Sequence, residues 1–431
     1  MTKWSVPFAV VAWSMMCLPV VGEDMARENA ELRRRVENLE QQVGDLQDAA
    51  DPAPKAAPRT TTVAPDEARK PFWSSLDIQF YGYIKADAAW DSSRVTTGNF
   101  VLFADEGGED DEEFNLTARQ TRFGLRINGP DLGDIETSGL IEGDFYGAGG
   151  TENKANFRMR HAYMKLLWPE DDFSVLAGQT WDVVSPLYPS TLNFTILWDA
   201  GNIGYRHPQI RLTKGVTLGD GMELEMAGAI SRTISDIEEA GGGGRPGENA
   251  GFPTLQGRVG LAFPWLGLEP TVIGLSGHWG EEEYTDTDIE SWSVNLDVLQ
   301  PVNECLSFKG EAFTGDNLDD YFGGIGQGVR DPNGADGTAE DAIGSSGGWA
   351  AVSIKADEDW RFNVGFGIDH VDTDDLGDSG RTRNRAIFGN AIYAVSDHMD
   401  VGVELSHWKT DYKDAGDVED VRIQGSFIYK F

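Results

Sequence analysis

The residues best suited to act on a charged ligand are arginines, which gather in a few segments of a strongly acidic chain. The sequence has 35 basic against 72 acidic residues, a formal net charge of −37 and an isoelectric point near 4.3. The arginines concerned are Arg122, Arg126, Arg158, Arg160, Arg206 and Arg211. Together with Lys85, Asp87, Glu142 and Asp144, they could create a field across a polar passage that orients a dipolar or anionic solute.

The spacing of these arginines favours placement on shared strand faces. Residues whose numbers are both even or both odd lie on the same face of a strand. Arg122 and Arg126 therefore share a face, whereas Arg206 and Arg211 lie on opposite faces. An arginine facing lipid costs about 2–4 kcal/mol at the bilayer midplane, so most must face water or another protein group. In the competing, structural interpretation, each arginine neutralises a wall carboxylate in an ion-pair ladder. Both interpretations remain open at this point.

No catalytic or metal-binding constellation is found in the sequence. The glycines of residues 323–328 lack the Lys-Ser or Lys-Thr of a phosphate-binding loop. Residues 372–378 are similar to a calcium loop, but Leu376 and Arg383 occupy its fifth and twelfth positions, and the six histidines are dispersed. We therefore expect no enzyme activity, no cofactor and no metal site. The negative charge also argues against a nucleic-acid partner.

Long runs of alternating residues supply the elements that would position the charged side chains. Residues 76–90 carry apolar or small side chains at even positions, and residues 421–431 repeat the pattern up to an aromatic carboxyl terminus. Tight turns alternate with long loops between such runs, which is typical of an all-β membrane barrel. About 356 residues at roughly 22 per strand predict about sixteen antiparallel strands.

A single amphipathic strand would also fit a soluble β-sandwich, but the number of runs favours the barrel. We expect the barrel-assembly machinery to recognise the C-terminal Phe431. The predicted segments are a signal peptide at 1–22, a periplasmic coiled coil at 23–47, a Pro/Ala-rich linker at 48–75 and the barrel at 76–431.

The coiled coil is indicated by apolar residues at spacings of four and three. Val36 and Leu39 occupy its core positions, and Arg35 and Glu40 flank them. This arrangement is similar to a recurring pattern that specifies trimers, so these four residues are predicted to support trimerisation.

One loop differs from the acidic or glycine-rich others because it is aromatic and contains proline. It includes Trp181, Asp182, Tyr188 and Asn193. Such a loop is suited to fold inward and narrow the channel as a constriction loop. The alternative is a loop that packs against a neighbouring subunit.

Several short motifs together resemble those of the DcaP-like trimeric porins. They are RVENLE at 35–40, FYGYIKAD at 80–87, RQTRFG at 119–124, AGQTW at 177–181 and RHPQIR at 206–211. The resemblance implies a sixteen-stranded trimeric channel with a periplasmic N-terminal coiled coil and passive uptake of small anionic solutes such as dicarboxylates. The chain departs from this pattern in its strong acidity and its Gly/Asp-rich loops.

We therefore expect an outer-membrane porin that forms a homotrimer, contacts outer-membrane lipid and lipopolysaccharide, and passes small hydrophilic solutes by diffusion. The alternative function is a structural outer-membrane anchor or envelope tether that acts through the periplasmic coiled coil.

Overall fold

The computed structural model describes residues 76–234, 246–267, 269–284, 287–330 and 341–431. All of them belong to the second of two compact units, Lys70–Phe431. The predicted signal peptide, coiled coil and linker lie outside the described residues, as do Arg35, Val36, Leu39 and Glu40. No helix within the described ranges is long and apolar enough to cross a membrane.

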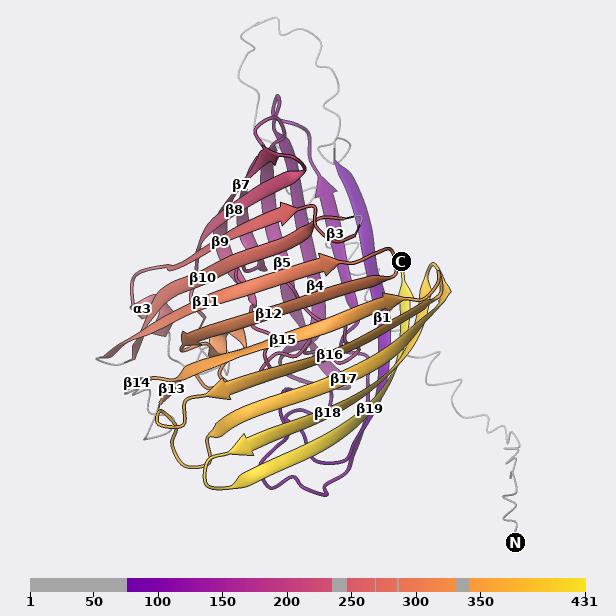
Figure 1. The fold of residues 1–431 in the computed structure, drawn as a ribbon, viewed down its shortest axis with the longest axis vertical. Helices are drawn as coiled ribbons and strands as arrows, with labels where there is room; N and C mark the ends of the chain where they lie inside the picture. Colours follow the sequence, from indigo (N-terminus) through magenta and orange to yellow (C-terminus); the bar gives the residue numbers. More distant parts are fainter. Residues whose placement is uncertain (1–75, 235–245, 268, 285–286, 331–340) are drawn as a thin grey trace, which may run out of the picture. The chain divides into compact units, whose positions relative to one another are not determined.

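The described residues are mostly β-strands (Figure 1). The strands are β1 (Asp77–Asp91), β2 (Glu113–Thr117), β3 (Arg122–Asn128), β4 (Glu136–Thr151), β5 (Lys154–Trp168), β6 (Phe173–Trp181), β7 (Arg206–Gly219), β8 (Met222–Ser231), β9 (Thr254–Phe263), β10 (Thr271–Tyr284), β11 (Thr287–Pro301), β12 (Leu306–Asp316), β13 (Val329–Arg330), β14 (Asp341–Ala342), β15 (Gly344–Lys355), β16 (Trp360–Val371), β17 (Arg381–Ser396), β18 (Met399–Tyr412) and β19 (Gly416–Lys430). Two short helical segments are described, α3 (Pro246–Asn249) and η2 (Asp319–Tyr321).

One antiparallel sheet closes on itself to form a barrel. β2 and β3 pair with the same edge of β1, at residues 87–91 and 77–83 respectively, so together they form one wall strand. The other edge of β1 pairs with β19, with Asp91 opposite Arg422. The predicted barrel of sixteen antiparallel strands is confirmed, and so is the pairing of the C-terminal strand with the first.

Burial alternates along the strands as the sequence predicts. In β19, Ile423, Phe427 and Tyr429 point outward and are 48%, 57% and 54% exposed, whereas Arg422 and Gln424 are buried inside. An outward apolar band of this kind is suited to lipid, because a hydrocarbon solvent imposes no cost on exposed apolar side chains.

The connections at one end of the barrel are turns of a few residues, and the long connections all lie at the other end, together with some short turns. Residues 220–221 connect β7 to β8, whereas residues 92–112 connect β1 to β2 and residues 182–205 connect β6 to β7. In outer-membrane barrels the short turns are periplasmic. The carboxyl terminus therefore lies at the periplasmic end, where the Phe431 amide donates to the Gly82 carbonyl.

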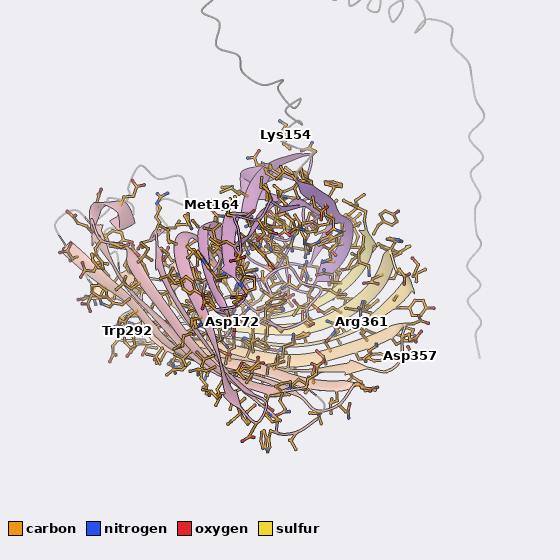
Figure 2. The ribbon with its side chains drawn as sticks, turned by 90° about the horizontal axis from the view of Figure 1, so that it is seen from above. Lys154, Met164, Asp172, Trp292, Asp357 and Arg361 are labelled. Carbon is orange, nitrogen blue, oxygen red and sulfur yellow. The ribbon has the colours of Figure 1, made fainter. Side chains whose placement is uncertain are left out.

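Side chains and connections that fold inward occupy much of the interior of the barrel (Figure 2). One buried cluster joins Val101 and Leu197, from two of these connections, to Trp349, Phe388 and Trp408 of the wall. The core therefore lies between the inner wall and the inward-folded connections.

A buried ion pair fastens connection 92–112 to the two strands that close the barrel. Arg422 Nη1 donates to both carboxylate oxygens of Asp91 at 3.0 Å, and both side chains are at most 1% exposed. Arg422 Nη2 donates to the Asn99 carbonyl oxygen at 2.9 Å. This pair therefore joins β1, β19 and the connection at one point.

We predict that Arg422→Ala lowers the unfolding temperature of the folded barrel, because it leaves the Asp91 carboxylate buried without its partner. Breaking one side of a buried pair typically costs about 3–5 kcal/mol. Heat-modifiable gel mobility measures the transition. The double variant Asp91→Asn, Arg422→Gln should recover much of the loss, and equal destabilisation of both variants would contradict the explanation.

Candidate functional site

Guanidinium groups are concentrated on the inner wall from β3 to β7. Arg158 donates to Asp144 through Nε at 3.0 Å and Nη2 at 2.8 Å. Arg160 donates to Glu142 at 2.8 Å and to Asp144 at 3.4 Å, and Arg122 Nε lies 3.5 Å from Glu142. These three arginines therefore form the ladder of ion pairs with wall carboxylates that the competing interpretation predicts.

Three other predicted site residues have no carboxylate within ion-pair distance among the described residues, namely Arg126, Arg206 and Arg211. Arg126 lies 3.8 Å from the centre of the Tyr81 ring. Arg211 donates to the Trp181 carbonyl oxygen at 3.3 Å. Their charges are therefore held by rings and carbonyl groups, which do not neutralise them.

Arg206 is the most enclosed of the set. It is 1% exposed, and its guanidinium lies 4.4 Å from the Trp181 ring, 4.6 Å from Tyr205 and 5.7 Å from Trp198. Its two terminal nitrogens have no hydrogen-bond partner within the described part of the chain. Cation–π attraction of about 2 kcal/mol or more at desolvated sites offsets part of the cost of burying this charge. Although its parity differs from that of Arg211, both lie on the inside, because residues 182–205 cover the start of β7.

The wall as a whole carries more positive than negative charge. We define the arginine wall as Arg119, Arg122, Arg126, Arg158, Arg160 and Arg206 with the carboxylates of Glu142 and Asp144. Six guanidinium groups thus face two carboxylates, and a third carboxylate, Glu152, lies 3.9 Å from Arg119 at the rim. Local charge is therefore the opposite of that of the whole chain.

Residues 182–205, here called the inner loop, cross the interior from β6 to the far wall. Glu404 of β18 accepts hydrogen bonds from the backbone amides of Leu192 and Asn193 at 2.6 and 3.0 Å. Lys85 of β1 and Gln424 of β19 donate to the Leu192 carbonyl oxygen at 2.7 and 2.9 Å. The tip of the loop is therefore fastened by charged and amide groups from three strands.

Further contacts hold the rest of the inner loop. Glu311 of β12 accepts from the Leu187 amide at 2.7 Å, and Asn390 of β17 donates to the Ser190 carbonyl oxygen at 2.8 Å. Gly201 has a φ of +107°, and a side chain there would clash with the backbone of wall residue Gly348. Glycine thus permits the close approach of the loop to the wall.

The four residues predicted to form a constriction fall into two groups. Asp182 is buried, lies 2.9 Å from His207 Nδ1 and accepts from Gln256 at 3.0 Å. Asn193 is also buried, so both residues fasten the loop. Tyr188 is half exposed and its ring centre lies 6.3 Å from that of Trp181. That these residues narrow a channel stays a prediction.

Lys85 and Asp87 lie under the inner loop. They are 3% and 5% exposed, and Lys85 Nζ lies 3.3 Å from Asp87. Lys85 supports the loop through its bond to the Leu192 carbonyl oxygen, and Asp87 accepts from Ser426 beside it. That Lys85 and Asp87 line a passage stays a prediction.

Sequence reasoning missed the residues that hold the loop from the far wall, which are Glu311, Asn390, Glu404 and Gln424. In the sequence, these residues are marked only by their positions on the inward face of alternating strands. The pattern does not show which inward residue meets the loop, because that depends on the path of the chain across the barrel.

A second connection, residues 317–328, packs against the inner loop. Trp198 stacks on Phe322 with ring centres 4.3 Å apart, and the Gly204 amide donates to the Tyr321 carbonyl at 2.7 Å. Burial raises the pKa of Asp199 in the inner loop to about 7, although the charge of Arg381 opposes this rise. Across the described ranges, no group of three His, Cys, Asp or Glu residues is placed to hold a metal ion.

Comparison with known proteins shows a similar fold, and a resemblance to one family over part of the chain. Residues 30–227 match the family model described as DcaP outer membrane protein. The crystal structure of the outer membrane channel DcaP of Acinetobacter baumannii is similar, with a TM-score of 0.67 and 22% identity over 83% of this chain and 98% of that chain. The resemblance to the DcaP-like proteins is therefore confirmed.

Other porins share the fold at lower identity. The anion-selective porin from Comamonas acidovorans is 14% identical, with a TM-score of 0.53 over 83% of this chain and 100% of that one. The trimer form of OmpT from Vibrio cholerae is 10% identical, with a TM-score of 0.51 over the same shares. No curated protein matches the sequence. The family match and the fold together support an outer-membrane porin channel.

We predict that Glu404→Ala raises single-channel conductance in planar bilayers, because the tip of the inner loop loses its acceptor. Hydrogen bonds to a charged group contribute about 1.5–3 kcal/mol each. Glu404→Gln keeps one accepting oxygen and should change conductance less. The control Glu136→Ala removes a carboxylate from β4 near the turn end. An unchanged conductance in Glu404→Ala would show that the loop needs no such anchor.

Proposed function

We propose that this DcaP-like porin is a homotrimeric channel for passive diffusion of small organic anions, including dicarboxylates. The observation that carries the proposal is the arginine wall, in which six guanidinium groups face two carboxylates. Arg119, Arg122, Arg126 and Arg158 are partly exposed and can meet a solute, whereas Arg160 and Arg206 are buried and act through their field.

The mechanism requires no chemical step. A carboxylate that leaves water near the arginine wall exchanges part of its hydration for guanidinium hydrogen bonds, which match its geometry. A site of this kind must bind weakly enough for the solute to leave, so that permeation follows the concentration gradient. The carboxylates of Glu142 and Asp144 limit the positive charge and so keep binding weak.

The homotrimer is supported by the trimer form of the OmpT fold relative and by the predicted coiled coil at residues 23–47. The pattern around Arg35, Val36, Leu39 and Glu40 is the part of the chain that would specify three helices. The alternative function, an envelope tether, would also act through residues 23–47, and none of the residues that the structure describes bears on it.

We predict that the double variant Arg122→Ala, Arg126→Ala shifts the reversal potential at asymmetric salt toward cation preference, because two partly exposed positive charges leave the wall. Planar bilayers containing the folded protein measure it. The matched control Arg94→Ala, Lys154→Gln removes two cations from the long-loop end. At about 1 M mean salt, where the screening length is about 3 Å, it should leave the reversal potential nearly unchanged.

Two results would contradict the proposal. Absence of stepwise conductance from folded protein would exclude the channel function. An equal shift in both double variants would show that the position of the arginines does not matter.

We also predict that relative anion permeability rises with salt concentration. The long-loop end of the barrel is acidic, and anions must approach through its negative potential before they reach the arginine wall. The screening length falls from about 30 Å at 0.01 M to about 10 Å at 0.1 M, so salt removes this penalty first. Reversal potentials at a fixed concentration ratio and increasing mean concentration check the trend, and a falling anion preference would contradict it.

A further inference from the structure

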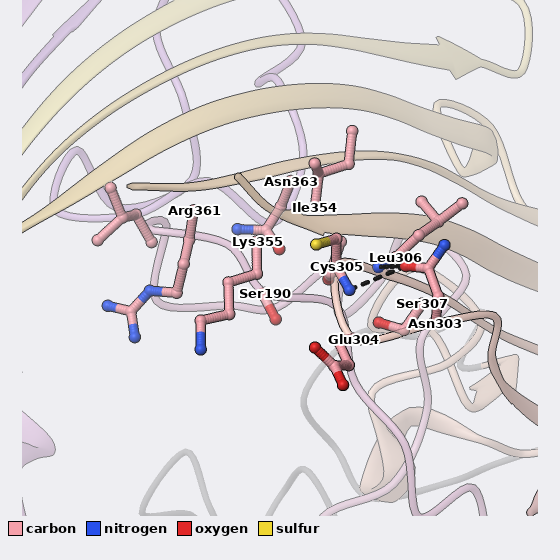
Figure 3. Close-up of a pocket in the computed structure, with 12 residues that line it drawn as sticks. Ser190, Asn303, Glu304, Cys305, Leu306, Ser307, Ile354, Lys355, Arg361 and Asn363 are labelled. Carbon is pink, nitrogen blue, oxygen red and sulfur yellow. Dashed lines mark hydrogen bonds between the residues drawn. The ribbon is translucent and has the colours of Figure 1, made fainter. Parts of the chain in front are cut away.

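A separate cavity of about 380 Å³ lies at the periplasmic end of the barrel, beside the inner loop (Figure 3). Its walls are the turn ends of β12, β15, β16 and β17, and Ser190 of the inner loop contributes one side. At about 30 Å³ per water, it holds the equivalent of roughly twelve waters. The arginine wall on β3 to β7 does not contribute to it.

Two cations line this cavity, Lys355 and Arg361. Figure 3 shows Lys355 between Arg361 and the turn that carries Glu304 and Cys305. No carboxylate lies within ion-pair distance of Lys355 in the described ranges. Arg361 donates to Asp400 at 2.9 Å, but Asp400 also accepts from Lys430 at 3.1 Å, so one carboxylate is shared by two cations. Glu304 is the single acid among the lining residues, and the local balance is positive.

Neutral polar groups complete the lining and connect it to the inner loop. Asn363 is 6% exposed and donates to Asn390 at 2.8 Å, and Asn390 in turn donates to the Ser190 carbonyl. Ser307 and Ser353 add hydroxyl groups, which can donate to an anion. A cavity with two cations, hydroxyls and amides has the groups that a carboxylate requires.

We propose that this cavity is a second binding site for small carboxylates, at the periplasmic exit of the channel, in which Lys355 and Arg361 hold the carboxylate group. The proposal rests on the proposed function, because it assigns a second weak site to the same permeating solutes. Glu304 opposes anion binding and keeps the site weak, as release into the periplasm requires.

Cys305 offers a direct test, because it lines the cavity, is exposed, and is the only cysteine of the described residues. The protein without its predicted signal peptide, residues 1–22, which contains Cys17, is treated with two methanethiosulfonates, the anionic sulfonatoethyl and the cationic trimethylammonioethyl compound. Each reaction rate is taken relative to the rate of the same reagent with a free thiol. We expect the anionic reagent to be favoured. An added charge at about 4 Å in water changes a rate on the order of fivefold.

The variants define the source of the preference. Lys355→Gln should reduce the preference for the anionic reagent by about this factor, and Glu304→Gln should increase it, because each removes one neighbouring charge. The matched control Lys154→Gln removes a lysine at the long-loop end of the barrel and should have no effect. In the protein without substitutions, added succinate should lower the rate at which the anionic reagent reacts with Cys305. An uncharged methanethiosulfonate should react equally with all variants, which shows that the cavity stays accessible.

Several results would overturn the proposal. They are a preference for the cationic reagent, the same response in Lys355→Gln and Lys154→Gln, no protection by succinate, or no reaction with the uncharged reagent. Reversal potentials of the same proteins separate this failure from that of the proposed function. An anion-selective channel without these thiol responses would lack only the exit site, whereas a cation-selective channel would contradict the proposed function itself.

Discussion

The fold depends on the closure of the sheet between β1 and β19. A lipid bilayer offers no hydrogen bonds to backbone amides and carbonyls, so a strand-built wall must pair every edge. Once Asp91 stands opposite Arg422, the register of both strands is set, and with it the face on which each side chain lies. A shift by one residue would turn Arg422 and Gln424 into lipid and Ile423 into the interior. The buried Arg422–Asp91 ion pair joins β1 and β19, so a shift in register would also cost the free energy of breaking this pair.

A closed barrel with polar residues inside has a second requirement, because its inward charges need partners. The inner loop supplies many of them with its own backbone. The amides of Leu192 and Asn193 satisfy Glu404, and the Leu192 carbonyl accepts from Lys85 and Gln424. A loop held by charged and amide groups from three neighbouring strands is a fixed part of the interior. Lys85, which the strand pattern turns inward, is consequently buried where it donates to this loop.

The strand pattern predicted the barrel well because parity is a local property that survives folding. It was less informative where the register changes. Between β4 and β5, Glu142 lies opposite His161 but Gly143 lies opposite Met159, so Arg160 is the extra residue of a bulge. Arg160 and His161 are consequently both buried, which alternation alone does not allow. Arg206 is a similar case, because its burial comes from Trp181 and the inner loop and not from its parity. The partners of the loop could not be predicted, since they depend on contacts more than a hundred residues apart.

Selectivity in such an interior depends on which charges remain after neighbours have neutralised one another. Arg122, Arg158 and Arg160 share the two carboxylates of Glu142 and Asp144, so these five groups retain one net positive charge. Arg126 and Arg206 are held by aromatic rings, which stabilise a cation through their faces without cancelling its charge. Aromatic side chains therefore let the wall retain positive charge while they offset part of the desolvation cost. The tyrosines and tryptophans beside these arginines thus differ from the carboxylates, because they stabilise a guanidinium group and leave its charge in place.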